Sequence, residues 1–212
     1  MYLLDEQLWF PPPHLADESG LLAIGGDLTP ERLLLAYQNG VFPWFNAGQP
    51  ILWHSPDPRM VLFPEALKVS KSMRQLVRKE TFEVTFNRDF ESVIRACAAI
   101  PRQGQDDTWI TDDMIFAYRR LHELGHAISV EVWQDQQLVG GLYGISLPEQ
   151  KVFCGESMFS KVSNASKIGF VTWVQHLQKQ GYQLIDCQVH TDHLASLGAK
   201  EITRIDFLKY LK

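Results

Sequence analysis

Apolar residues recur at every third or fourth position in three segments of the chain, 68–79, 111–125 and 163–181. This spacing lines up one face of a helix, so each segment is predicted to be helical. Ser70 and Thr111 are suitable N-cap residues for the first two helices. The apolar positions are Val69, Met73, Leu76 and Val77 in the first helix, Met114, Tyr118 and Leu121 in the second, and Phe170, Trp173, Val174 and Leu177 in the third, which begins at Ser163 or Asn164.

Strand patterns occupy the rest of this region. Two apolar segments, 127–133 and 138–145, are joined by a polar turn and predict a hairpin, which a third strand at 151–157 extends. A strand at 183–190, a short helix at 192–198 and a final strand near 201–206 complete the chain. This order of elements predicts an α+β (mixed α/β) fold with a mixed, largely antiparallel sheet. It resembles the N-acetyltransferase-like (GNAT) fold, in which a meander is followed by a helix, a strand and another helix.

The first 60 residues are rich in Pro, Gly and aromatic side chains, and they read as loops around one short helix. Thr29 is a suitable N-cap for this helix, and Asn39-Gly40 follows its end. Three prolines between residues 56 and 64 then punctuate the chain. We therefore expect a small N-terminal α+β domain at residues 1–60 and a GNAT-like catalytic domain at residues 61–212.

Composition places the chain among ordinary globular proteins, with 45% hydrophobic residues, 21% charged residues and a net charge of −5. No stretch approaches the roughly 20 apolar residues that a membrane-spanning helix needs, and the N-terminus is a poor secretory signal. We therefore expect a cytoplasmic protein without a membrane partner. Three cysteines, Cys97, Cys154 and Cys187, form no CxxC pair, which argues against a disulfide framework and a zinc site.

One segment of this acidic chain carries a stripe of positive charge only. Such a stripe is of interest because nucleic-acid binders are usually basic over the contact face. The basic residues of segment 68–79 fall on the side opposite its apolar residues, with Glu65 and Glu80 only at the margins. Such a stripe is often only a solvated face, but it is also what contacts to an RNA backbone need. The five residues are Lys68, Lys71, Arg74, Arg78 and Lys79.

Asp186 and Gln188 lie two apart in the predicted strand 183–190. Alternation along a strand predicts that both lie on one face, with Cys187 and its neighbours on the other. A carboxylate beside a carboxamide can orient an amine and accept its proton, although two polar residues on the solvated face of a sheet would look the same. Glu156 follows an apolar strand where the chain changes direction, so it could hold an amine or be a surface turn residue.

Several strings resemble the leucyl/phenylalanyl-tRNA–protein transferase family in the same order along the chain. They include GLLAIGGDLTPERLLLAYQNGVFPWF, PILWHSPDPRMVL, TWIT, AYRRLHELGHAISVEVW, LVGGLYGI, FCGESMFS, NASK, LIDCQV and HLASLGA. The resemblance implies transfer of Leu, Phe or sometimes Met from aminoacyl-tRNA to the N-terminal Arg or Lys of an acceptor protein. The new N-terminal residue would mark that protein for degradation, and neither a metal nor an organic cofactor is implied.

The resemblance also implies roles for individual residues. Asp186 and Gln188 would relay the proton of the attacking amine, and Glu156 would bind the amine of the donor. Trp44 and Trp109 are the better candidates for stacking on the 3′ adenosine, with Tyr37 and Phe42 as further candidates; for Phe42 we favour a plug between the domains. The implied aminoacyl pocket consists of Leu142, Phe153, Phe170, Trp173, Leu177 and Ile185.

Two departures from the family bear on affinity. The chain ends at Lys212, whereas family members often continue with a basic, aromatic tail, and Leu142 stands where the family often has methionine. We expect a monomer.

Three other functions fit parts of the sequence. A CoA-dependent GNAT acyltransferase would need an Arg/Gln-x-x-Gly-x-Gly/Ala loop, which the segment 159–169 lacks. A cysteine hydrolase would pair Cys187 with His190 or His193, although the alternation predicts a packed Cys187. A non-catalytic tRNA-binding module would leave the Asp186/Gln188 pair and the pocket without a role.

Overall fold

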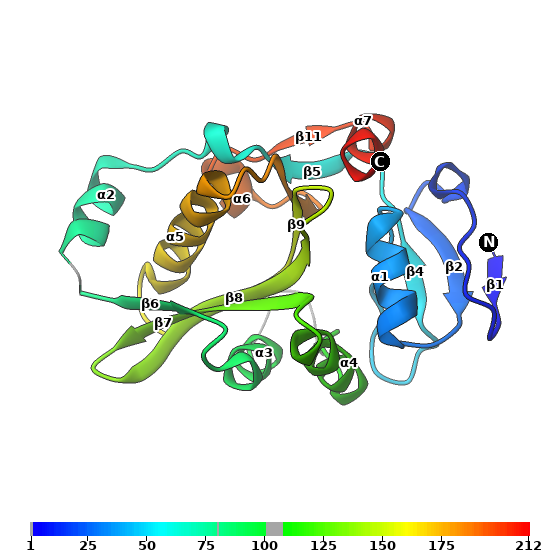
Figure 1. Cartoon of the computed structure of the whole chain (residues 1–212), viewed down its shortest axis with the longest axis horizontal. Coiled ribbons are helices and arrows are strands. Elements are labelled where there is room, and N and C mark those ends of the chain that lie inside the picture. Colours follow the sequence, from blue (N-terminus) through cyan, green and yellow to red (C-terminus); the bar gives the residue numbers. More distant parts are fainter. Residues whose placement is uncertain (1, 80, 101–107) are drawn as a thin grey trace.

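The computed structural model describes residues 2–79, 81–100 and 108–212, which are arranged around two β-sheets (Figure 1). The smaller sheet belongs to the N-terminal region and has the strand order β1-β2-β4-β3, in which only β1 and β2 are parallel. Helix α1 lies between this sheet and the rest of the molecule (Figure 1). The elements are β1 (Tyr2–Leu4), the 3₁₀ helix η1 (Pro13–Leu15), β2 (Leu21–Gly25), α1 (Pro30–Gln38), β3 (Phe42–Pro43) and β4 (Leu52–His54).

The larger sheet has the strand order β11-β5-β10-β9-β8-β7-β6. Its neighbouring strands are antiparallel except for β9 and β10, which are parallel because helix α5 connects them. The strands are β5 (Arg59–Leu62), β6 (Glu83–Phe86), β7 (Ala127–Gln134), β8 (Gln137–Leu147), β9 (Val152–Ser160), β10 (Leu184–Gln188) and β11 (Lys200–Ile202).

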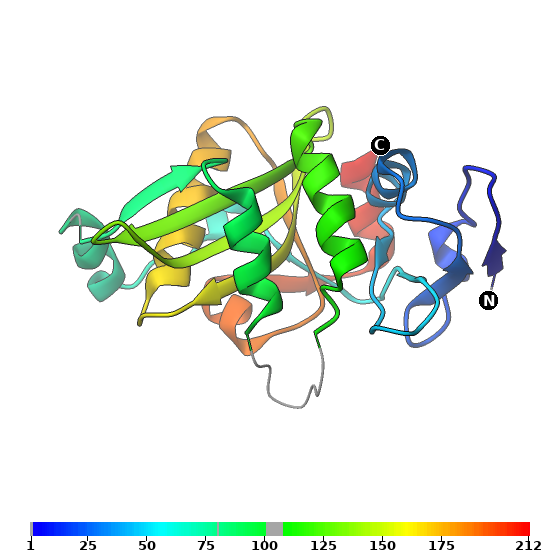
Figure 2. The ribbon, with the colours of Figure 1, turned by 90° about the horizontal axis from the view of Figure 1, so that it is seen from below.

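Helices cover both faces of the larger sheet, with α5 on one face and α3 and α4 on the other (Figures 1 and 2). Helix α2 packs on α5 through Met73, which contacts a cluster containing Ile168 and Val171. No helix among the residues with a described position is long and apolar enough to cross a bilayer. The helices are η2 (Pro64–Ala66), α2 (Lys71–Arg78), α3 (Phe90–Ala98), α4 (Asp112–Glu123), α5 (Ala165–Lys179), α6 (Asp192–Ser196), α7 (Arg204–Leu208) and η3 (Lys209–Leu211).

The predicted helices of the larger domain are confirmed, and their N-caps act as expected. Ser70 Oγ accepts a hydrogen bond from the backbone N–H of Met73, and Thr111 Oγ1 accepts one from Met114. Asn164 precedes α5 in a left-handed conformation. The meander β7-β8-β9, followed by α5, β10 and α6, has the order expected of the N-acetyltransferase-like fold.

The prediction for the end of the chain was only partly right. Strand β11 ends at Ile202, and α7 begins two residues later, so residues 204–206 are helical instead of extended. Thr203 explains the change, because its Oγ1 accepts a hydrogen bond from the N–H of Asp206 and caps the helix. The pattern also missed β5, β6, α3 and the individual strands of the N-terminal region, for which an α+β domain was expected.

One apolar core joins the two regions. It includes Leu22 and Trp53 from the N-terminal sheet together with Tyr118 of α4 and Phe207 of α7. Residues 55–58 connect β4 of the smaller sheet to β5 of the larger sheet, where β5 pairs with β10 and β11. The N-terminal region is therefore packed onto the larger sheet, and this contact forms one wall of the site described next.

Candidate functional site

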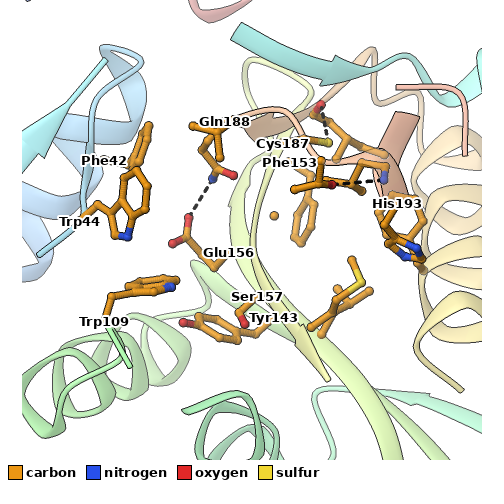
Figure 3. Close-up of a pocket in the computed structure, with 18 of the residues that line it drawn as sticks. Phe42, Trp44, Trp109, Tyr143, Phe153, Glu156, Ser157, Cys187, Gln188 and His193 are labelled. Atoms are coloured by element: carbon orange, nitrogen blue, oxygen red, sulfur yellow. Dashed lines mark hydrogen bonds between the residues drawn. The ribbon is translucent and has the colours of Figure 1, made fainter. Parts of the chain in front are cut away.

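A cavity of about 530 Å³ opens where β9 and β10 stop pairing. Their parallel ladder ends at the pair Asp186–Cys154, while β9 continues to Ser160. The cavity is lined from both faces of the sheet, so it passes through the sheet at this gap (Figure 3). Its lining consists of Phe42, Pro43, Trp44, Trp109, Leu142, Tyr143, Phe153, Gly155, Glu156, Ser157, Met158, Phe170, Ile185, Cys187, Gln188, Val189, Thr191, His193 and Leu194.

Two β-bulges place polar side chains at the gap. In β9, Tyr143 pairs with Ser157 and Gly144 with Gly155, so Glu156 is the extra residue. In β10, the register against β5 shifts between Asp186 and Gln188. A bulge bends its strand and redirects the side chains around it. Glu156 and Gln188 therefore face each other across the gap (Figure 3).

The predicted alternation of Asp186 and Gln188 is wrong for this strand. Gln188 lines the cavity together with Cys187, whereas Asp186 is not part of the lining. The cause is the bulge together with the left-handed backbone of Gln188, whose φ is 58°. Both features interrupt the period of two on which the prediction rests.

Asp186 is held in a buried ion pair with Arg59 of β5, and each side chain is only 1% exposed. Arg59 Nε donates to Asp186 Oδ1 at 2.8 Å, and Nη2 donates to Oδ2 at 2.6 Å. Asp186 Oδ1 also accepts the backbone N–H of Gln188 at 3.0 Å. The carboxylate of Asp186 therefore contacts the backbone of Gln188, and this contact fixes the turn that carries the Gln188 side chain.

Arg59 extends this contact to the N-terminal region and the C-terminal helix. Its Nη1 donates to the carbonyl oxygen of Gly40 at 3.1 Å. Its guanidinium carbon lies 4.9 Å from the ring centre of Phe42 and 4.5 Å from that of Phe207. Because Phe42 lines the cavity, the same arginine fixes one wall of the site and the turn at Gln188.

Glu156 receives hydrogen bonds from two sides of the cavity. Its Oε1 accepts from Gln188 Nε2 at 3.3 Å, and its Oε2 accepts from the hydroxyl of Tyr118 at 3.1 Å. The hydroxyl of Tyr118 also contacts that of Tyr37. Burial raises the pKa of Glu156 to about 8, although hydrogen bonding by the two tyrosines opposes the rise. This carboxyl group can therefore gain or lose a proton near neutral pH.

Four of the six predicted pocket residues line the cavity on the α5 side of the sheet: Leu142, Phe153, Phe170 and Ile185. Trp173 and Leu177 do not reach the wall. Trp173 packs edge-on against Phe153, with ring centres 5.3 Å apart, and Leu177 is buried in the same cluster. Both side chains support the wall from behind, a distinction that helical periodicity alone does not make.

Three of the four predicted stacking residues line the opposite, N-terminal side of the cavity. Trp44 is 38% exposed, whereas Trp109 and Phe42 are buried (Figure 3). The prediction for Tyr37 needs correction, because its side chain is 1% exposed and does not line the cavity. Tyr37 is enclosed by protein outside the cavity, so a base in the cavity cannot reach its ring, and its hydroxyl contacts that of Tyr118 instead.

Several lining residues were not predicted from the sequence. Met158 lies beyond the bulge in β9, so alternation along the strand does not assign it to the apolar wall. Gly155 and Ser157 flank Glu156 in that strand. Thr191, His193 and Leu194 lie in or before α6, which packs beside the end of β10. No local pattern in the sequence predicts that α6 packs against this wall.

The predicted basic stripe is exposed on and before α2, at the opposite end of the larger domain from the N-terminal sheet (Figure 1). Four of its residues, Lys71, Arg74, Arg78 and Lys79, belong to the helix or to its C-cap. Lys68 is also exposed, but it precedes the N-cap Ser70 and therefore lies outside the helix. The stripe is separate from the cavity, and its role stays a prediction.

The geometry bears on the cysteine hydrolase. Burial raises the pKa of the Cys187 thiol, which keeps it protonated and makes it a poor nucleophile for a cysteine hydrolase. Within the described ranges, no group of three or more His, Cys, Asp or Glu residues could hold a metal ion.

Comparison with solved structures finds weak likenesses. One is an aminoglycoside acetyltransferase from an uncultured soil sample, with a TM-score of 0.41 and 14% identity over 62% of this chain and 88% of that one. Another is a conserved protein of Bacteroides thetaiotaomicron, with a TM-score of 0.45 and 10% identity over 74% of this chain and 55% of that one. Scores this low say nothing further about the site.

Comparison of sequences is decisive. The model of the leucyl/phenylalanyl-tRNA protein transferase family matches residues 61–212, and the model of that family's N-terminal domain matches residues 26–57. The chain is 60% identical to the leucyl/phenylalanyl-tRNA–protein transferase of Christiangramia forsetii, with 100% of both chains covered. It is 58% identical to that of Pseudomonas aeruginosa PAO1, over 96% of this chain and 89% of the relative. The chain therefore belongs to the leucyl/phenylalanyl-tRNA–protein transferase family of enzymes.

Proposed function

We propose that this enzyme transfers leucine or phenylalanine, and less often methionine, from tRNA to the N-terminal Arg or Lys of an acceptor protein. The observation that carries the proposal is the cavity through the sheet. It has aromatic rings on one side, an apolar chamber on the other, and Glu156 with Gln188 between them. An aminoacyl ester needs these three environments for its adenosine, its side chain and its reacting carbonyl.

In the proposed reaction, the neutral α-amine of the acceptor attacks the ester carbonyl. A carbon–nitrogen bond forms, the bond to the ribose oxygen breaks, and the tRNA leaves with a free hydroxyl. An α-amine has a pKa of about 7.7–8.0, so part of it is neutral at cytoplasmic pH. Positioning and removal of one proton are the main requirements, because the ester is already activated.

The site supports a division of roles among its polar residues. Gln188 can accept a hydrogen bond from the amine through its carboxamide oxygen, while its Nε2 holds Glu156. Glu156, with a pKa of about 8, would hold the amine of the donor, and only its ionised minority at neutral pH could take up a proton. Asp186 would act as a positioning residue, since both its oxygens are bound to Arg59.

The remaining features of the proposal concern the substrates and the state of the enzyme. Trp44 and Trp109 would stack on the terminal adenosine, because base stacking on aromatic rings is worth about 1–3 kcal/mol per base. The exposed basic stripe on α2 would follow the tRNA backbone. The enzyme would be a cytoplasmic monomer whose products are marked for degradation by their new N-terminal residue.

Transfer of radiolabelled Phe tests the proposal directly. We expect label from Phe-tRNA on a protein that begins with Arg and none on an otherwise identical protein that begins with Asp. Both acceptors are present at equal concentration with the same donor, and label is counted after hydrolysis of the remaining aminoacyl ester. Label on both proteins would reject the acceptor rule, and label on neither would reject the transfer reaction.

The raised pKa of Glu156 predicts a pH-dependent effect of Glu156→Gln on stability. The folded protein holds a proton on this group between about pH 4.5 and 8, whereas the unfolded chain releases it, so wild-type stability falls as the pH rises through this range. The variant has no such loss. The free energy of unfolding of the variant minus that of wild type, measured by urea unfolding, should rise by on the order of 3 kcal/mol between pH 5.5 and 8.

Glu123→Gln on the exposed face of α4 is the matched control, because it makes the same exchange outside the cavity. An equal difference at both values for Glu156→Gln would contradict the raised pKa.

Arg74→Ala combined with Arg78→Ala should weaken binding of Phe-tRNA by about tenfold. The salt dependence of log Kd should lose a slope of about 1.5, since each lost phosphate contact removes roughly 0.7–0.9. The matched control removes two arginines that already form ion pairs, Arg88 with Glu83 and Arg95 with Glu91. If the control changes the slope as much as the test pair does, the stripe on α2 has no special role.

A further inference from the structure

Two glycines face each other across β8 and β9 at the edge of the gap. Gly144 pairs with Gly155, and neither has a positive φ, so the backbone itself does not require glycine at either position. They differ in their relation to the cavity. Gly155 is part of the lining and precedes Glu156, whereas Gly144 lies outside it.

Gly144 is required by the packing of the fold. A Cβ at this position would lie 2.2 Å from the carbonyl oxygen of Cys154 and 2.5 Å from Cζ of Phe153. The first of these atoms belongs to the backbone of the neighbouring strand, so it cannot move aside without disturbing the sheet. A side chain at Gly144 would therefore destabilise the protein.

Gly155 has no such neighbour. A Cβ at this position would meet the carbonyl oxygen of Asp186 at 3.7 Å and Cε1 of Phe153 at 4.0 Å, which are ordinary van der Waals distances. The protein could therefore carry alanine here without rearrangement. Glycine leaves this part of the cavity wall without a side chain, between the end of the β9–β10 ladder and the ring of Phe153.

The position of Gly155 relates the two sides of the cavity. Tyr143 and Trp109 belong to the core on the α4 side of the sheet, and Phe153 belongs to the core on the α5 side. A ligand that occupies both sides of the cavity has to pass the edge of β9 at Gly155 and Glu156 (Figure 3). The bare backbone at Gly155 sets the width of this passage.

We propose that Gly155 is a specificity-determining residue that keeps the passage through the sheet wide enough for the aminoacyl side chain. This inference rests on the proposed function, because it requires the adenosine on one side and the side chain in the chamber on the other. A methyl group at this position narrows the passage. The planar ring of Phe is affected more than the thin, flexible chain of Met, while the tRNA body is bound outside the cavity and is unaffected.

The test compares Gly155→Ala and Gly155→Val with wild type, using one tRNA body charged with either Phe or Met. The Phe-to-Met ratio of kcat/KM should fall by about tenfold or more in Gly155→Ala, in line with the 10–200-fold that one methylene changes in an apolar pocket. It should fall further in Gly155→Val. Thermal unfolding and the Kd for the uncharged tRNA should stay at their wild-type values in Gly155→Ala.

Gly144→Ala is the matched control. It should lower the melting temperature, because its methyl group would collide with the backbone of β9 and disturb the sheet. An unchanged Phe-to-Met ratio in both Gly155 variants would overturn the inference, and so would a melting temperature of Gly155→Ala as low as that of Gly144→Ala. Wild type that transfers neither residue would instead contradict the proposed function.

Discussion

The buried ion pair between Arg59 and Asp186 is the contact on which the rest of the site depends. Removing two charges from water costs several kcal/mol per ion, and only good geometry with further hydrogen bonds offsets that cost. Both conditions hold here. Asp186 accepts two hydrogen bonds from Arg59 and one from the backbone of Gln188, and Arg59 also donates to Gly40. One pair thereby joins β5, β10, the N-terminal region and, through Phe207, the C-terminal helix.

This pair changes how the proposed reacting groups are understood. Asp186 does not line the cavity, so in the proposed reaction it would act through the turn at Gln188. That turn and the bulge at Glu156 bring a carboxamide and a carboxyl group together at a gap between two strands. The gap exists because parallel strands β9 and β10 stop pairing at Asp186, the residue that the ion pair holds. The buried ion pair and the proposed reacting groups therefore lie at the same place in the sheet.

Local signals predicted α1, α2, α4, α5 and α6 but not α3 or α7, because capping and periodicity act within a few residues, as at Ser70 and Thr111. The strands of the N-terminal sheet are only two to five residues long, too short for a pattern to appear. The catalytic candidates were found by resemblance, but the alternation that placed Asp186 with Gln188 failed at a bulge. Arg59 was missed entirely, since its partner lies 127 residues away and no local pattern connects them.

The most direct test of this account removes the ion pair without leaving a buried charge. Arg59→Met combined with Asp186→Leu should fold, because well-packed apolar residues often replace a buried pair without loss of stability. Steady-state transfer of Phe should show a kcat lowered by about 100-fold or more, with the KM for Phe-tRNA within about twofold of wild type, because losing an interaction that positions the reacting groups lowers kcat. A folded double variant with a wild-type kcat would contradict the claim that the pair positions Gln188 for the reaction.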